Sequence, residues 1–236
     1  TIYFAALEES CLLAKEEGPY ETFKGSPAHN KQLQFDLWGK TDHGFDRLKD
    51  EIVKWGLRNS LLVAPMPTAS TAQVMGNNEA FEPYTTNLYL RRTLAGEFVM
   101  INKHLVKDLQ KINKWNKDTK DKIVFEKGSV QNLDIPENLK EIYRTAWEIP
   151  ARSIIDMAAD RGPYIDQSQS MNLFVENPTT AKLSSMHMYS WKKGLKTGMY
   201  YLRTRAKASA IQFTLDPTKY SGPVCKMEEG CVVCSG

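Results

Sequence analysis

The sequence predicts an α/β fold. Segments in which apolar residues recur every three or four positions, which is typical of amphipathic helices, alternate with short runs that are almost wholly apolar. Runs of the second kind are found in strands buried on both faces, as in a parallel sheet covered by helices. The 236 residues are also enough for one large domain or two small ones with a sizeable core. This alternation of helices and strands favours an α/β arrangement.

Two helices are predicted near the start of the chain. Ile2–Glu17 has apolar residues at helical spacing and is followed by Gly18-Pro19, a pair that ends helices. Tyr20–His43 is rich in Gly, Pro, Ser and Asn and is predicted to be mostly loop, and Phe45–Gly56 is predicted to be the second helix. The expected buried face of the first helix consists of Ile2, Ala5, Ala6, Leu12 and Leu13.

The remaining elements alternate between strand and helix. Ser60–Ala64 is a short apolar run and is predicted to be a buried strand, and Glu137–Arg161 is predicted to be helical with a break at Pro150. Asp216–Gly236 has too few apolar residues to pack as an element and is expected to be a tail. The other predicted elements are a strand over Met171–Val175, a helix over Thr179–Leu195 and a strand over Met199–Thr204.

Composition and charge exclude several classes of protein. Charged residues make up 25% of the chain and hydrophobic ones 42%, as in ordinary globular proteins. The net charge of +3 gives no strong field, and acidic residues and Asn interrupt the Lys-rich stretch Lys103–Lys127, so we expect a solvated helical or loop surface and no nucleic-acid partner. There is no apolar run of about 18 residues and no signal peptide. We expect a cytoplasmic protein without a membrane partner.

The stretch LLVAPMPTASTAQ, Leu61 to Gln73, is the first candidate site. Its pattern predicts a strand, a tight turn and a new helix, and the first amide groups of a helix carry partial positive charge and lack intrahelical acceptors. A phosphate fits such a place, with hydroxyl donors from Thr68, Ser70 and Thr71 and close approach over Ala69. The alternative, favoured by the local pattern alone, is that Thr68 or Ser70 is simply an N-cap.

The adjacent tyrosines and the cysteines also have ordinary structural interpretations. Tyr200 and Tyr201 on an apolar strand are most often packing residues, and strand geometry points neighbouring side chains to opposite faces. A stacked pair would therefore need a local distortion, which Gly198 could permit. Cys11, in the first helix, is expected to be a small buried residue.

The CxxC spacing of Cys231 and Cys234 suits a disulfide that forms and reopens. Zinc is the competing interpretation, but only three cysteines lie in the tail and all four histidines lie far upstream, so we expect no metal site. A stand-alone CxxC oxidoreductase is disfavoured, because such proteins place the motif at a helix N-terminus. Cys225 is assigned no partner and is expected to be a surface thiol.

Longer stretches resemble the large subunit of class I ribonucleoside-diphosphate reductase in its eukaryotic and viral form. Besides APMPTASTAQVMGNNEAFEPYTTNLYLRR, they include WGLRNSLLVAP, AADRGPYIDQSQSMNLFV and KLSSMHMYSWKKGLKTGMYYLRTRAKASAIQFTL. IYFAALEESCLLAKEEGPYETFKGSP, at the start of the chain, belongs with them. They follow the family's order over most of the chain. The departures are at Val99–Leu133 and in a rather short Trp38–Phe45 loop.

The resemblance implies the reduction of ribonucleoside diphosphates to deoxyribonucleoside diphosphates by thiyl-radical chemistry. It implies that residues 1–215 form the C-terminal half of a ten-stranded α/β barrel and residues 216–236 a mobile redox-active tail. By the same resemblance, the substrate diphosphate binds at Thr68, Ala69, Ser70 and Thr71; Tyr200 and Tyr201 relay the radical; and Cys231 and Cys234 reduce the active-site disulfide.

The implied partners follow from the same resemblance. A small subunit holds the radical-generating metal centre, thioredoxin or glutaredoxin reduces the tail, and large subunits form a homo-oligomer. The ATP and dNTP effectors bind an N-terminal part, and no cofactor is expected on this segment.

The chain begins with Thr1 in what has the pattern of a mid-domain helix, so we expect a C-terminal portion of a longer protein. The family's substrate-reducing cysteines lie upstream of this position, and no Asn-Leu-Cys-x-Glu type motif occurs in the 236 residues. The alternative is a truncated, non-catalytic chain that binds the small subunit or thioredoxin.

We predict that the 236-residue chain alone forms no deoxyribonucleoside diphosphate, because it lacks the reducing cysteine motifs. The assay supplies a small subunit, a dithiol and substrate. Product above the background of the small subunit alone would contradict this prediction.

Overall fold

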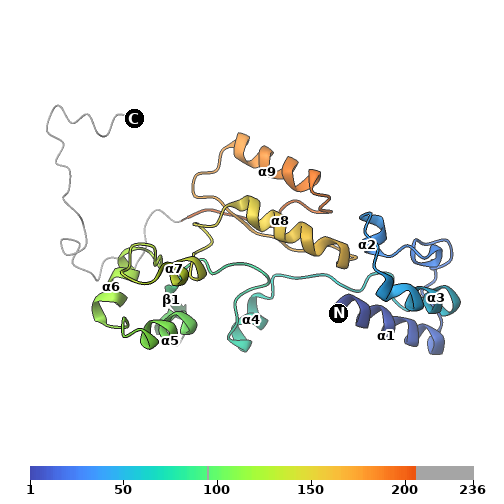
Figure 1. Ribbon diagram of the computed structural model, residues 1–236, viewed down its shortest axis with the longest axis horizontal. Coiled ribbons are helices and arrows are strands. Elements are labelled where there is room, and N and C mark those ends of the chain that lie inside the picture. Colours follow the sequence, from blue (N-terminus) through green and yellow to red (C-terminus); the bar gives the residue numbers. More distant parts are fainter. Residues whose placement is uncertain (95, 206–236) are drawn as a thin grey trace. The chain divides into compact units, whose positions relative to one another are not determined.

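The computed structural model describes residues 1–94 and 96–205, which divide into two compact units (Figure 1). Unit 1 consists of Thr1–Pro83 together with Ala146–Arg205, and the described part of unit 2 is Tyr84–Thr145. Segments from the two ends of the described chain therefore fold together in unit 1. The boundary expected between residues 215 and 216 lies outside the described residues.

Helix α1 (Ile2–Glu17) has the predicted limits but a different buried face. Ile2 and Leu12 are 77% and 54% exposed, so the expected face is wrong in its main members. The buried apolar positions follow a different stripe at helical spacing, which contains the larger side chains and packs against α3 (Asp46–Trp55). They are Tyr3, Leu7, Cys11 and Ala14.

The second predicted helix is confirmed as α3, and the predicted loop before it contains short helical turns. These are η1 (Ala28–Asn30), α2 (Gln34–Leu37) and η2 (His43–Phe45). α2 and η2 bring buried apolar side chains to the core that α1 and α3 share, which is why the segment is more ordered than its composition predicts. The buried members of this core are Tyr3, Leu7, Cys11, Phe23, Leu33, Phe35, Phe45, Leu48, Ile52 and Leu57.

The second core of unit 1 forms around α8 (Ala151–Arg161), which begins directly after Pro150 as the predicted break requires. Figure 1 shows α8 and α9 (Thr180–Lys192) side by side, and the Tyr189 hydroxyl on α9 donates to Asp156 on α8 at 2.7 Å. The short turn η3 (Gly162–Tyr164) follows α8. The core residues are Ala146, Ile154, Ile155, Ala158, Ala159, Met171, Leu173, Phe174 and Leu195.

Two of the predicted strands are confirmed as a short parallel pair. β3 (Leu173–Phe174) and β4 (Leu202–Arg203) align with Leu173 opposite Leu202. Both are shorter than predicted. Parallel strands need a crossover connection, and α9 lies in that connection, so the pair is a β-α-β unit.

The predicted strand at Ser60–Ala64 is wrong, because the structure has no strand there. Leu61 is 51% exposed, and the amide groups of Leu62 and Val63 donate to the Asp166 side chain instead of a neighbouring strand. The carboxylate oxygens of Asp166 thus take the place of carbonyl oxygens from a neighbouring strand, so the segment forms no regular β-ladder.

Within residues 1–94 and 96–205 the strands form two two-stranded sheets and no closed barrel. The combination of helices with a parallel strand pair agrees with the predicted α/β class.

Unit 2 combines a hairpin with three helices in its described part. β1 (Leu88–Thr93) and β2 (Gly96–Ile101) pair antiparallel, with Leu88 opposite Ile101. The Lys-rich stretch forms α5 (Lys103–Lys111) and α6 (Lys117–Phe125), and α7 (Glu137–Ile142) follows. The helical surface expected from the lysines is therefore present. It covers a core made of Leu88, Leu105, Leu109, Ile123, Val124, Val130, Leu133, Leu139 and Tyr143.

The buried side chain of Asn87 fixes the centre of unit 2. Its amide nitrogen donates to the carbonyls of Gly128 and Tyr143 at 3.0 and 2.8 Å, and its oxygen accepts from Asn102 at 3.0 Å. Asn102 also caps α5 by accepting from the His104 amide. Because the polar atoms are paired, this side chain is tolerated at 1% exposure.

Gly162→Ala in unit 1 is predicted to destabilise the fold. Gly162 has helical backbone angles that alanine accepts, but an added Cβ would lie 2.4 Å from the Trp38 ring, which is too close. We expect a loss of about 1–3 kcal/mol in the free energy of unfolding, measured by urea denaturation.

Trp38→Leu, made alone and together with Gly162→Ala, is the control, because it removes the ring atoms that clash with the added Cβ. The two changes should then be strongly non-additive in a double-mutant cycle. Simple additivity would show that the cost of Gly162→Ala does not come from this contact.

Candidate functional site

The turn predicted after Leu61–Pro65 is present and leads into helix α4 (Ala69–Met75). Thr68, the residue directly before α4, has a φ of 57°. This value lies in the left-handed region that a β-branched residue rarely adopts. Ala69, Ser70 and Thr71 then form the first turn and are exposed. The turn therefore presents amide and hydroxyl donors to solvent at the positive end of the helix.

Thr68 occupies the N-cap position, but its side chain does not cap α4. Its hydroxyl oxygen accepts instead from the amide of Ala80, at 2.9 Å. Ser70 lies inside the first turn. The N-cap interpretation therefore holds for the position of Thr68 but not for the hydrogen bond that usually explains a threonine there.

Residues 61–67, which lead into α4, run beside residues 166–170. The Asp166 carboxylate accepts from Leu62 N at 2.9 Å and from Val63 N at 2.7 Å. Two backbone hydrogen bonds continue the contact, from Gln167 N to Val63 O at 3.2 Å and from Ser170 N to Pro65 O at 3.0 Å. The start of α4 is thus fixed to the chain that enters β3.

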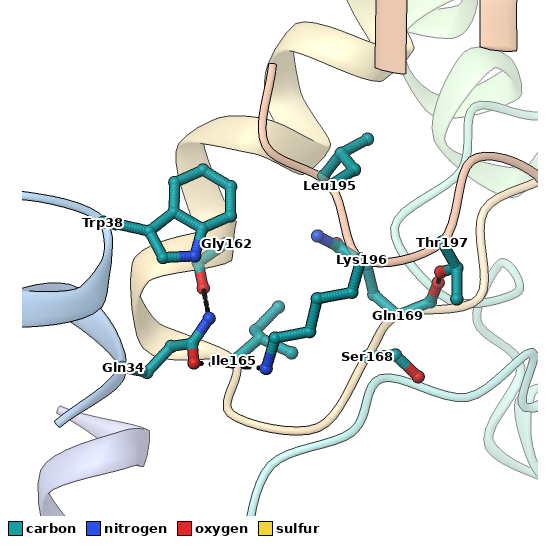
Figure 2. Close-up of a pocket in the computed structure, with 9 residues that line it drawn as sticks. All are labelled: Gln34, Trp38, Gly162, Ile165, Ser168, Gln169, Leu195, Lys196 and Thr197. Carbon is teal, nitrogen blue, oxygen red and sulfur yellow. Dashed lines mark hydrogen bonds between the residues drawn. The ribbon is translucent and has the colours of Figure 1, made fainter. Parts of the chain in front are cut away.

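A small cavity lies where residues 168–169 and 195–197 meet the ends of α2 and η3 (Figure 2). Lys196 Nζ donates to Gln34 Oε1 at 3.1 Å and to the Asp166 carbonyl, and Gln34 Nε2 donates to the Gly162 carbonyl at 3.4 Å. Burial lowers the pKa of Lys196, and the nearby Asp166 charge opposes that shift. The cavity volume is about 10 Å³, room for one water at most, so this is a packing junction rather than a substrate site.

Tyr200 and Tyr201 lie on one side of the chain just before β4. Their ring centroids are 4.3 Å apart and the ring planes are tilted by 59°. Both side chains are about half exposed, at 52% and 50%, so neither is a buried packing residue. The two aromatic rings are therefore in contact with each other and with solvent.

A bulge before β4 explains why adjacent residues share a side. The β3–β4 register, continued backward, would have Tyr201 N donate to Met171 O. Instead, Tyr200 N donates to Met171 O at 2.8 Å, and Tyr201 N donates to the Asn172 side-chain oxygen at 3.2 Å. Two residues therefore occupy the place of one, as in a β-bulge.

Gly198 lies just before the distorted stretch, and a larger residue would not fit there. The φ of Gly198 is not in the left-handed region, and its lack of a side chain makes room for His187, whose Nδ1 would lie 2.9 Å from an added Cβ. The expected distortion is present, but the hydrogen bond to Asn172 accompanies it.

The surroundings of Tyr200 favour its protonated form. The hydrogen bond with Tyr201 raises the pKa of Tyr200, and the charge of Arg203 opposes that shift. The Arg203 guanidinium lies 4.9 Å from the centroid of the Tyr201 ring, a cation–π contact.

The other predicted residues divide between the described part and the tail. Cys11 is buried and free, and burial raises the pKa of its thiol, as expected for a small core residue. Cys225, Cys231 and Cys234 lie outside the described residues, as does the predicted tail. Among the residues that are described, no three His, Cys, Asp or Glu gather into a possible metal site. No described helix is long and apolar enough to cross a membrane.

Sequence reasoning missed three polar residues that hold the site together: Glu82, Asp166 and Asn172. The signal for Asn172 was available, because an asparagine in the predicted strand Met171–Val175 interrupts an apolar run. Asp166 and Glu82 lie in loop-like sequence, where an acidic residue is ordinary. Their roles depend on contacts over more than 80 positions of the chain.

Comparison with known proteins gives the family. The sequence model of the ribonucleotide reductase barrel domain matches residues 1–201. The chain belongs to this family.

Curated relatives agree with this assignment. The chain is 62% identical over 222 residues to the ribonucleoside-diphosphate reductase large subunit of Dictyostelium discoideum, covering 92% of this chain and 26% of that protein. It is 55% identical over 239 residues to the large subunit of Monkeypox virus, covering 100% of this chain and 31% of that protein. The chain thus spans less than a third of the length of these relatives.

A solved structure supports the fold. The alpha subunit of the class Id ribonucleotide reductase of Actinobacillus ureae is similar with a TM-score of 0.55 and 25% identity. The match covers 89% of this chain and 36% of that one.

Tyr201→Phe is predicted to lower the pKa of Tyr200, because the hydrogen bond with Tyr201 is the largest cause of its raised value. The measurement is a fluorine NMR titration of 3-fluorotyrosine placed at position 200. Arg203→Gln is the matched control, and it should shift the pKa upward, because the arginine charge acts in the opposite direction. An unchanged pKa in Tyr201→Phe would show that the two hydroxyls do not interact.

Proposed function

We propose that this chain works as the C-terminal part of the large subunit of a ribonucleoside-diphosphate reductase. The reaction replaces the 2'-hydroxyl of a ribonucleoside diphosphate by hydrogen, while a dithiol becomes a disulfide and water leaves. The observation that carries the proposal is the exposed first turn of α4 in the same unit as the adjacent rings of Tyr200 and Tyr201. Membership of the barrel-domain family supports it.

The first turn of α4 is the proposed grip for the substrate diphosphate. The amides of Ala69, Ser70 and Thr71 have no intrahelical acceptor, and the hydroxyls of Ser70 and Thr71 add donors. The small Ala69 side chain lets phosphate oxygens reach the backbone. The hydroxyl oxygen of Thr68 accepts from the Ala80 amide, which leaves its O–H able to donate to a phosphate oxygen, and the Thr68 conformation sets the turn.

The proposed role of Tyr200 and Tyr201 is to carry an oxidising equivalent. Each phenol loses a hydrogen atom in turn, its electron and proton leaving together, and recovers it from the next donor. The raised pKa of Tyr200 favours this route, because the phenol does not lose its proton alone at neutral pH. The radical-generating metal centre is proposed to lie in a partner small subunit.

The proposed function of Cys231 and Cys234 is thiol–disulfide exchange. The pair becomes a disulfide as it reduces the disulfide left in the active site, and thioredoxin or glutaredoxin then reduces the pair. ATP and dNTP effectors are proposed to bind an N-terminal part of the large subunit. No cofactor is proposed to bind this segment itself.

The proposed architecture is a ten-stranded α/β barrel to which unit 1 contributes strands, in a homo-oligomer of large subunits. Leu61, which is exposed in this chain, is proposed to pack against the rest of the barrel in the complete subunit. The proposed cellular location is the cytoplasm.

Tyr200→Phe in the complete large subunit tests the relay. We expect turnover to fall to background while substrate binding is nearly unchanged, because phenylalanine keeps the ring and removes the hydroxyl. Tyr164→Phe is the matched control, an exposed tyrosine of the same unit that lies outside the pair. Retained turnover in Tyr200→Phe would remove this residue from the relay.

Replacement of Cys231 and Cys234 by serine tests the tail. Turnover driven by thioredoxin should be lost, whereas much of the turnover driven by a small dithiol should remain, because a small molecule enters the active site directly. Cys225→Ser is the control. Equal losses with both reductants would argue that the pair is structural.

A further inference from the structure

We infer that Asn172, held by Glu82, is a positioning residue that places Tyr200 and Tyr201 side by side and ties them to the segment carrying α4. The geometric part of this inference stands on the contacts of Asn172. Its consequence for turnover rests on the proposed function of the tyrosine pair.

The Asn172 side chain uses its oxygen and its nitrogen in two directions. Its Oδ1 accepts from the amide of Tyr201 at 3.2 Å, the bond that accompanies the bulge. Its Nδ2 donates to Glu82 Oε2 at 3.0 Å, and its own backbone amide donates to Glu82 Oε1 at 2.9 Å. Glu82 therefore holds Asn172 with both carboxylate oxygens, and this fixes which way the side-chain amide points.

Burial makes the identity of this residue important. Asn172 is 4% exposed and lies directly before β3. An apolar side chain here would leave the Tyr201 amide and a Glu82 oxygen without these partners, and a buried polar group without a partner is costly. An aspartate would keep the acceptor for Tyr201 but would place a second carboxylate against Glu82.

The same contacts join the tyrosine pair to the candidate phosphate site. The segment that contains α4 is tied at one end by Ser170 N to Pro65 O, at 3.0 Å. It is tied at the other end by Glu82 to Asn172. Residues 170 and 172 thus hold both ends of the segment, and residue 172 also holds Tyr201. A change at Asn172 therefore acts directly on Tyr201 and on Glu82.

Exchanging the carboxylate and the amide between positions 82 and 172 tests the inference in the complete large subunit. Asn172→Asp should move the tyrosine pair, because the new carboxylate repels Glu82. Adding Glu82→Gln restores the pattern, because the amide nitrogen introduced at position 82 donates to the new carboxylate, while the remaining oxygen still accepts from the backbone amide of residue 172. Glu82→Gln alone provides a second test if Asn172→Asp does not fold.

The direct measurement is the fluorine NMR resonance of 3-fluorotyrosine placed at position 200 or 201. We expect both resonances to shift in Asn172→Asp and to return in the double variant. Turnover should fall by about tenfold or more and recover with the resonances, as expected when one hydrogen bond in a reacting geometry is lost. Asn177→Asp is the matched control, since that asparagine is exposed and its side chain lies outside this network.

The outcomes separate this inference from the proposed function. Resonances that stay unchanged in both Asn172→Asp and Glu82→Gln overturn the inference, whatever happens to turnover. Resonances that shift while turnover is retained support the positioning role and contradict the relay. A double variant as impaired as Asn172→Asp would overturn the assignment of Glu82 as the group that orients Asn172.

Discussion

Unit 1 depends on a carboxylate that takes the place of a neighbouring strand. Asp166 accepts the amides of Leu62 and Val63, and this contact holds the extended segment before α4 against the chain that leads into β3. Without the Asp166 carboxylate, the backbone amides of Leu62 and Val63 would lose their hydrogen-bond acceptor. The segment that leads to the turn at Thr68 would then no longer be held in place. The candidate phosphate site and the tyrosine pair therefore share one support, since residues 166–172 connect to both.

Glu82 repeats this arrangement at the other end of the same segment. Its carboxylate accepts the backbone and side-chain amides of Asn172, which in turn accepts the amide of Tyr201. Both acidic side chains thus act by accepting hydrogen bonds from amides rather than by pairing with cations. Such contacts fix geometry at short range, and the ring centroids of Tyr200 and Tyr201 lie 4.3 Å apart beside them.

Much of the helical framework was predictable from the sequence, because helices are specified by local spacing and by stop signals such as Gly18-Pro19 and Pro150. The limits of α1 were correct, yet its buried face was not, since burial depends on what packs against the helix. The strand predicted at Ser60–Ala64 failed for a related reason: a distant carboxylate takes its amides. The tyrosines and the α4 turn were visible as motifs, but the bulge involves a hydrogen bond to Asn172, nearly 30 positions away, which local sequence does not reveal.

The most direct test of the central claim is a crystal structure of the complete large subunit with a ribonucleoside diphosphate bound. The account predicts phosphate oxygens within hydrogen-bond distance of the amides of Ser70 and Thr71, with the contacts of Asp166 and Glu82 retained. A diphosphate bound away from the first turn of α4 would contradict it.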